Sequence, residues 1–331
     1  IAANLISKSL RMASDRELSS WLKSQVVEDD SLNEKNLKRA QNLASQLGIK
    51  GTIKNESEKP TFNQIDADIW GMNKGFIPNF ENVSEATLCT TISNQYGVKV
   101  STIEHLMAAF LGLGVDNAVV ELDSQEVPIL DGSAMNFVKI LRETGLKNSD
   151  VPIKLIKINN KVEIKEGNKS IIIEKSNTSL EIEFEINYEN KLIKKQKNKI
   201  NVFEDKLDDV FNSRTFCLYE DIEKLKKIGL GKGGSLENAI VVRNDKILNE
   251  NGLRNKNEFV NHKILDCMGD LYLVGYRLIG SLKCKHGGHS LTNKLLRKVF
   301  SDNKNYSLIE IKGKNLPHSL INNRHNLKSI A

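Results

Sequence analysis

Four segments between residues 151 and 187 alternate apolar and polar residues, and this alternation restricts the chain to a fold built around an antiparallel sheet. The segments read PIKLIKI, KVEIKEG, KSIIIEK and LEIEFEI, with turn signals between them. A period of two places the apolar side chains of each strand on one face, as in half-buried strands. Helical patterns follow at about 217–228, 257–274 and 291–300. A sheet followed by helices predicts an α+β fold.

The preceding region mixes strands and helices in a similar way. A helix is predicted from Thr102 to Leu111, followed by a turn at Gly112 and Gly114 and by the strand NAVVEL. A glycine-rich loop precedes DNAVV at 116 and ENAIV at 237, which hints at two similarly built halves. Residues 1–65 instead show polar helical patterns. We therefore predict an atypical helical N-terminal segment (1–65), a first α+β domain (66–149) and a second α+β domain (150–331).

Composition and charge limit the kinds of partner and the cellular compartment that we expect for this protein. The 331 residues carry a formal net charge of +6, mostly from lysine, which favours a phosphorylated ligand or a membrane surface. Aromatic residues make up only 6% and form no cluster with arginine, so we expect no nucleic-acid partner. The first residues have too short an apolar run for a secretory signal, and no run suits a transmembrane helix, which predicts a cytoplasmic protein. The four cysteines contain no CxxC pair, which fits reduced thiols.

The stretch NEFVNHKILDCMGD, residues 257–270, predicts a helix with chemistry on one side. His262, Asp266 and Asp270 are spaced four residues apart and project from nearly one face, opposite an apolar face. An imidazole and a carboxylate one turn apart form a pair of ligands for a divalent metal. The alternative is a solvated face with a hydrogen bond between residues four apart.

The segment TIEHLMAAF adds a second helix with an adjacent Glu104 and His105 among apolar residues. Burial of these groups is costly unless they are satisfied. Adjacent helical residues point about 100° apart, so one can bind a metal while the other faces a ligand. His105, His262 and Asp266 would form a His2Asp set with an open position for water. Asp270 and His289 could form a carboxylate–imidazole pair suited to general-acid catalysis.

Two further features in this part of the chain carry weaker signals. Lys263 would place a positive charge near the pocket, although a helical lysine is by default solvated. The segment GLGKGGS lacks the spacing of a nucleotide-binding P-loop, so it predicts a tight turn with backbone room for a ligand.

Five ordered motifs carry a resemblance to a known family. They are STIEHLMAAFLGLGVDN, EVPILDGSAMNFV, SRTFCLYEDIEKLKKIGLGKGGSLENAIVV, NEFVNHKILDCMGDLYLVG and GGHSLTNKLL. Together they resemble the UDP-3-O-acyl-N-acetylglucosamine deacetylases, zinc amidases of lipid A biosynthesis in Gram-negative bacteria, from about residue 75 to near the C-terminus. The resemblance implies two similar α+β domains, each with a mainly antiparallel sheet and two helices, with the helices packed between the sheets.

The resemblance also implies an activity and its partners. The family hydrolyses the N-acetyl group of UDP-3-O-(3-hydroxyacyl)-N-acetylglucosamine and releases acetate. We accordingly expect a zinc metalloamidase with a nucleotide-sugar lipid as substrate, transient contact with the inner-membrane surface, and a monomer. Fe²⁺ could occupy the same metal ligands.

Roles carry over from the family at matching positions. The zinc ligands match His105, His262 and Asp266. Glu104 matches the general base that activates the attacking water. For the remaining positions, the resemblance implies oxyanion stabilisation by Thr215, a charged partner or general acid in His289, orientation of that histidine by Asp270, a substrate lysine in Lys263, and packing on the sugar by Phe216.

Three departures from the family pattern qualify this resemblance. Residues 1–65 lack the strand pair and the glycine- and histidine-containing turn with which family members begin, so the first domain looks incomplete. His286 stands where the family often has a lysine, three residues before the general-acid histidine. The lysine-rich segment 186–202 occupies the region in which we expect the passage for the acyl chain. The alternative function is therefore an inactive or impaired homologue, or a fusion fragment, that retains metal and substrate binding.

Overall fold

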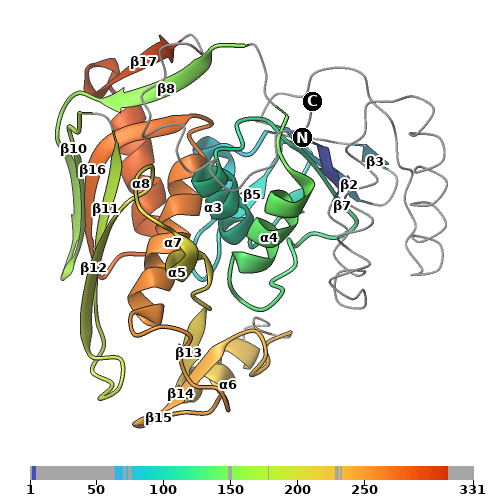
Figure 1. Cartoon of the computed structure of the whole chain (residues 1–331), viewed down its shortest axis with the longest axis vertical. Helices are drawn as coiled ribbons and strands as arrows, with labels where there is room; N and C mark the ends of the chain where they lie inside the picture. Colours follow the sequence, from blue (N-terminus) through green and yellow to red (C-terminus); the bar gives the residue numbers. More distant parts are fainter. Residues whose placement is uncertain are drawn as a thin grey trace.

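The structure is a computed structural model, and it confirms the predicted α+β class, with mainly antiparallel sheets. It describes residues 2–4, 64–69, 72–73, 77–147, 151–177, 179–227, 231 and 233–311. Helices lie in a layer between a large sheet on one side and a smaller sheet on the other (Figure 1). None of the helices in these ranges combines the length and the apolar character needed to cross a membrane.

The large sheet has seven strands and contains all four alternating segments as predicted. Its strands are β8 (Ile153–Ile158), β9 (Val162–Glu166), β10 (Lys169–Glu174), β11 (Leu180–Asn187), β12 (Lys195–Asn201), β16 (Arg277–Lys285) and β17 (Tyr306–Ile311). The order β12-β11-β16-β10-β9 places β16 at the centre, while β8 pairs with both β16 and β17. Strand β16, absent from the sequence prediction, therefore holds the sheet together.

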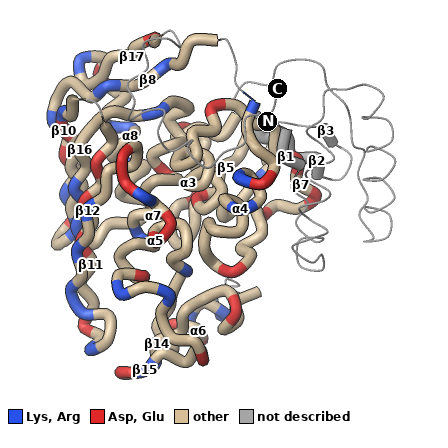
Figure 2. The backbone as a smooth tube through the Cα atoms, in the orientation of Figure 1, with Lys and Arg blue, Asp and Glu red and all other residues tan. Residues whose placement is uncertain are grey.

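The outer face of the β11–β12 hairpin carries a ladder of opposite charges. Along β11, Leu180, Ile182, Phe184 and Ile186 are buried, and the glutamates between them face the lysines of β12. The pairs are Glu181–Lys199, Glu183–Lys197 and Glu185–Lys195, with N···O distances of 3.2, 2.9 and 3.2 Å (Figure 2). Charged side chains discourage pairing of an edge strand with another chain. Segment 186–202, where we expected the acyl passage, thus forms the end of β11, the turn and β12.

In the described residues, the four helices that the sequence predicted are present, with ends shifted by a few residues. They are α3 (Glu104–Leu113), α6 (Tyr219–Lys227), α7 (Glu258–Tyr272) and α8 (His289–Phe300), together with α4 (Met135–Thr144) and the short α5 (Asp208–Phe211), which were not predicted. Helices α7 and α8 cover the inner face of the large sheet, and α3 packs on the other side of α7 (Figure 1).

Helix α7 is buried on all sides, with Lys263 as the exception among its residues. Its polar stripe therefore faces the protein interior, which excludes the alternative of a solvated face. Helix α3 approaches closely at Gly269, where an added Cβ would lie 2.0 Å from the carbonyl oxygen of Glu104. Only a glycine permits this spacing between the two helix backbones.

Three smaller sheets complete the described fold. The first region contains β4 (Val83–Glu85), β5 (Thr91–Ser93) and β6 (Lys99–Val100) in one sheet, and β1 (Ala2–Asn4), β7 (Val119–Leu122), β2 (Gln64–Ile69) and β3 (Met72–Asn73) in another. Strands β13 (Phe216–Leu218), β14 (Ile240–Arg243) and β15 (Lys246–Ile247) form the third beside α6.

The predicted helical segment 1–65 falls mostly outside the described residues. Its described parts, residues 2–4 and 64–65, are strand residues whose strands pair in parallel with β7. The proposed division into domains stays a prediction.

Substitution of Gly269 tests the close approach of α3 and α7. We expect Gly269→Ala to lower the free energy of unfolding by about 3 kcal/mol, because the methyl group meets backbone that cannot rotate away. Gly288→Ala is the control, since nothing lies within 4 Å of its added Cβ. Chemical denaturation would measure both. Equal stability of the two variants would contradict the close approach.

Candidate active site

Six buried polar side chains converge from three helices at the centre of the molecule. Glu104 and His105 come from the first turn of α3, and His289 begins α8. His262, Asp266 and Asp270 come from successive turns of α7. All six are at most 5% exposed, in a part of the molecule where an unpaired charge is costly. The structure therefore brings together the six residues that the sequence singled out for acid–base and metal chemistry.

Two histidines and one aspartate have the spacing of a metal site. His105 Nε2 lies 3.6 Å from Asp266 Oδ1, and His262 Nε2 lies 3.4 Å from the same oxygen. The ligand atoms of the three residues all lie within 4.8 Å of one another. A tetrahedral ion with bonds of about 2.0–2.1 Å holds its ligand atoms about 3.3 Å apart. The separations therefore fit three ligands around one ion.

The neighbours of these side chains leave the facing atoms free for an ion. The Ser213 carbonyl lies 3.1 Å from His262 Nδ1, which favours a proton on Nδ1 and a lone pair on Nε2. Lys263 Nζ donates to Asp266 Oδ2 at 2.7 Å. Within the described part of the chain, buried Asp266 Oδ1 has no hydrogen-bond donor. A cation at this position would satisfy that oxygen.

The pKa shifts agree with a ligand set that is ready for a cation. Burial lowers the pKa of His262 to about 3, so its imidazole is neutral and can ligate. Burial alone would raise the pKa of Asp266, but His262, Lys263 and the nearby ring of His105 hold it well below its usual value. The aspartate is therefore ionised beside a neutral His262, as a divalent metal requires.

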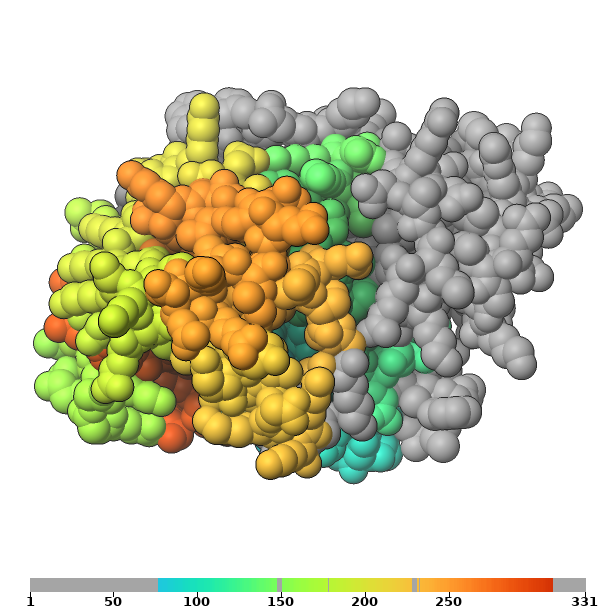
Figure 3. Space-filling view, turned by 90° about the horizontal axis from the view of Figure 1, so that it is seen from below, coloured from blue at the N-terminus to red at the C-terminus, as the bar shows by residue number. Residues whose placement is uncertain are grey.

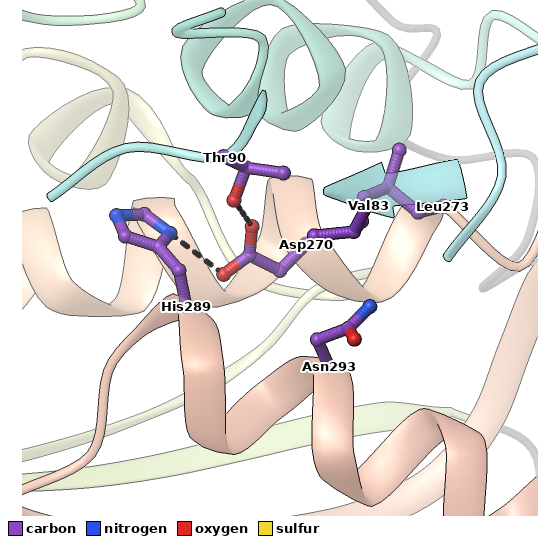
Figure 4. A pocket seen from close by; sticks show the side chains of 6 residues that line it. All are labelled: Val83, Thr90, Asp270, Leu273, His289 and Asn293. Atoms are coloured by element: carbon purple, nitrogen blue, oxygen red, sulfur yellow. Dashed lines mark hydrogen bonds and ion pairs between the residues drawn. The ribbon is translucent and has the colours of Figure 1, made fainter. Parts of the chain in front are cut away.

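Next to this set, Glu104 and His289 form a candidate acid–base pair. Glu104 Oε1 lies 3.8 Å from His289 Nε2, which is also 3.8 Å from Asp266 Oδ2. His289 Nδ1 is 2.8 Å from Asp270 Oδ2, and Thr90 Oγ1 donates to Asp270 Oδ1 at 2.5 Å (Figure 4). The ring of His289 is thereby fixed with Nε2 directed toward the metal ligands.

The surroundings of Glu104 and His289 set different protonation states for the two side chains. Burial raises the pKa of Glu104, although His289 and His105 oppose the shift. Burial would lower the pKa of His289, but Asp270 and the hydrogen bond to it, followed by Glu104 and Asp266, raise it to about 9. A carboxylate of increased basicity therefore faces a protonated imidazole, which suits a general base and a general acid.

Thr215 and Phe216 follow closely after Ser213, whose carbonyl contacts the candidate ligand His262. The Thr215 N–H donates to the Gly132 carbonyl at 2.8 Å. The Phe216 ring packs against Phe259, with 5.0 Å between centroids, and lies 6.4 Å from the ring of His262. The Phe216 ring also packs edge-to-face against the Tyr188 ring, with 5.7 Å between centroids. Lys263, predicted as a substrate lysine, forms an ion pair with Asp266 and so also orients a ligand.

Sequence reasoning missed several supporting residues. Thr90, Ser213 and Tyr188 belong to no recognisable spacing pattern. Arg214 and Glu258 form a buried ion pair with Nε···Oε1 of 2.8 Å, and the Arg214 N–H also donates to Glu258. This pair fixes the segment whose Ser213 carbonyl accepts from His262. Two sequence features could have pointed to this ion pair: Glu258 in the first turn of a buried helix, and Arg214 in the segment RTF.

Metal analysis of variants tests the ligand set. We expect Asp266→Ala to weaken zinc binding at least about 100-fold, because it removes the oxygen that both histidines face. Asp270→Asn is the matched control, since it changes a buried carboxylate one turn away that lies outside the set. Zinc titration of metal-free protein, followed by elemental analysis, would measure both. Equal retention of zinc by Asp266→Ala would rule out this ligand set.

Comparison with known proteins identifies the family. Residues 52–301 match the family model described as UDP-3-O-acyl N-acetylglycosamine deacetylase. A protein of Pseudomonas entomophila is 45% identical over 231 residues, covering 69% of this chain and 76% of its own. A protein of Pasteurella multocida is 40% identical over 247 residues, covering 73% of this chain and 81% of its own. A protein of Actinobacillus pleuropneumoniae serotype 3 is 38% identical over 242 residues, covering 72% of this chain and 79% of its own. All three are named UDP-3-O-acyl-N-acetylglucosamine deacetylase.

The matched region contains both the metal ligands and the acid–base pair, and it extends over most of the chain and of each relative. The chain belongs to the UDP-3-O-acyl-N-acetylglucosamine deacetylase family.

Proposed function

We propose that this chain hydrolyses the N-acetyl group of a UDP-3-O-acyl-N-acetylglucosamine and releases acetate, as an amide hydrolase of lipid A biosynthesis. The observation that carries the proposal is the convergence of these groups. His289 Nε2 lies 3.8 Å from both Glu104 Oε1 and Asp266 Oδ2, and Asp266 Oδ1 lies 3.6 and 3.4 Å from the Nε2 atoms of His105 and His262. A general base, a general acid and a metal set meeting at one point are the parts that metal-assisted amide hydrolysis needs.

We propose Zn²⁺ as the ion, held by His105, His262 and Asp266. Nitrogen and carboxylate ligands with an open position are typical of catalytic zinc. Two histidines and one carboxylate also suit Fe²⁺, so iron is the second candidate. When bound, the ion would polarise the amide carbonyl and lower the pKa of a water molecule.

The protein's own groups then move the protons. Glu104 Oε1 accepts a proton from the water whose oxygen adds to the carbonyl carbon. His289 Nε2 donates its proton to the amide nitrogen as the C–N bond breaks, so that acetate and a free amine form. Asp270 holds His289 through Nδ1, which keeps the acidic proton on the side of the substrate.

The remaining predicted residues border the ligand His262 and support binding of the substrate. We assign the Thr215 hydroxyl to the developing oxyanion and Phe216 to the sugar, because Thr215 lies between Ser213 and Phe216. Lys263, less buried than the rest of α7, is assigned to the substrate in addition to its ion pair with Asp266.

The nature of the substrate supports the partners that we propose. A UDP-linked lipid places the reaction in the cytoplasm, with transient contact at the inner-membrane surface. All proposed catalytic groups come from one chain, which supports a monomer. Figure 3 shows a hollow in one face of the molecule, bordered by the yellow and orange residues around β13–β15. Teal atoms, the colour of α3 in Figure 1, are visible inside it. This hollow supports approach of the substrate from this side.

Acetate release tests the proposed function directly. The purified chain should release acetate from its UDP-3-O-acyl-N-acetylglucosamine substrate, lose this activity with a chelator and recover it with added zinc. Parallel addition of Fe²⁺ compares the two metals. No release by a folded, zinc-loaded chain would instead favour the alternative of an inactive homologue.

Removal of the proposed base tests the role of Glu104. We expect Glu104→Ala to bind zinc normally and to lose roughly 10²-fold or more in kcat, the usual size of a general-base effect. Elemental analysis and steady-state kinetics measure the two properties. Glu166→Ala, a surface substitution in the ion pair with Lys294, is the control and should retain turnover. Parent-like turnover of Glu104→Ala would refute the assignment.

A further inference from the structure

Thr90 contacts the proposed general base directly and contacts the proposed general acid through Asp270. Its hydroxyl lies 2.5 Å from Asp270 Oδ1, and its backbone N–H donates to Glu104 Oε2 at 3.1 Å. An ionised carboxylate only accepts hydrogen bonds, so the hydroxyl is the donor. The side chain is 2% exposed and borders a small pocket together with Asp270, His289 and Asn293 (Figure 4). One residue therefore links a carboxylate of α3 to a carboxylate of α7.

We propose that Thr90 is a positioning residue that sets the orientation of the general base and the general acid together. The inference rests on the proposed function, and it adds a residue to which the sequence and the family comparison gave no role. Thr90 has no contact with the metal ligands among the described interactions. It acts through Glu104 and through Asp270.

The hydroxyl fixes the acid through Asp270. Among the described residues, each oxygen of this carboxylate has one hydrogen-bond partner, Thr90 at Oδ1 and His289 at Oδ2. Loss of the hydroxyl would leave buried Oδ1 without its donor, and rotation of the carboxylate to find another would move Oδ2. The ring of His289 would follow, because its Nδ1 is bonded to Oδ2. Its Nε2 would then leave the position opposite Glu104.

The backbone N–H fixes the base in the same way. It occupies Glu104 Oε2, which leaves Oε1 as the oxygen that faces His289 at 3.8 Å. A single short segment thus selects which oxygen of each carboxylate is available for chemistry.

The segment that carries Thr90 is itself fixed to the helices of the site. The Thr90 carbonyl accepts from the N–H of Ile103, directly before α3, at 3.5 Å. Thr90 lies directly before β5, in the small sheet of β4, β5 and β6. Phe80 precedes this sheet. Its N–H donates to the carbonyl of Leu273, at the end of α7, at 3.0 Å, and its carbonyl accepts from Asn293 of α8 at 2.8 Å. Thr90 is therefore held relative to α3, α7 and α8, as positioning requires.

Thr90→Val tests the hydroxyl while it preserves shape and the backbone N–H. We expect kcat to fall about 10- to 100-fold, with KM and zinc content within about twofold of the parent. Thr90→Ser should recover most of the turnover. Thr91→Val is the matched control, because Thr91 is also buried and its hydroxyl donates to Ser101, outside the site. It should match Thr90→Val in thermal stability but keep the parent kcat.

A double-mutant cycle and a spectroscopic signal test whether Thr90 acts through Asp270. In the Asp270→Asn background, Thr90→Val should reduce kcat by less than about twofold further, because coupled residues are not additive. In the parent, the Nδ1 proton of His289 should give a downfield NMR signal that Thr90→Val shifts and Thr91→Val does not. The NMR signal tests the positioning role of Thr90 even if the chain releases no acetate. Absence of acetate release would refute the proposed function but not the positioning role. Equal kcat losses for the two valine variants, additive losses in the cycle, or an unshifted signal would overturn the proposal.

Discussion

The active site depends on the close approach of α3 and α7 at Gly269. The proposed metal set takes one ligand from α3 and two from α7, so its size is fixed by the distance between the two helix backbones. An added Cβ at Gly269 would lie 2.0 Å from the carbonyl oxygen of Glu104. This contact is made by the residue just before the ligand His105. A wider spacing would separate the histidine of α3 from Asp266 and move Glu104 away from His289.

Burial of so many ionisable groups is costly unless each has a partner, and the partners also determine the chemistry. Lys263 binds one oxygen of Asp266 and leaves the other to face two imidazoles. The Ser213 carbonyl directs the lone pair of His262, and Asp270 directs the ring of His289. The hydrogen bonds that stabilise the buried groups thus also aim them at one point. Stability and catalysis share the same interactions.

Much of this architecture was predictable from local sequence. The alternating segments are strands, and the helices that carry His105 and His262 are where their apolar spacing placed them. Strand β16 was missed because Arg277, Leu278, Ile279 and Gly280 are all buried, so its first half has no alternation. Helix α4 carries a helical signal in Phe137, Val138 and Leu141 that was not used. The candidate site residues on helices were found because helical spacing predicts which side chains lie on the same face of a helix. Thr90 was not, because its partner Asp270 is 180 residues away and no local pattern connects them.

The central claim is that two imidazoles and one carboxylate hold the ion between α3 and α7. X-ray absorption spectroscopy at the zinc edge of the loaded chain tests this set, since Cys267, a residue type that also binds zinc, directly follows Asp266 in the sequence. We expect only nitrogen and oxygen neighbours at about 2.0–2.2 Å, with the outer-shell scattering of two histidines. A sulfur neighbour at about 2.3 Å, or scattering from fewer than two imidazoles, would contradict it.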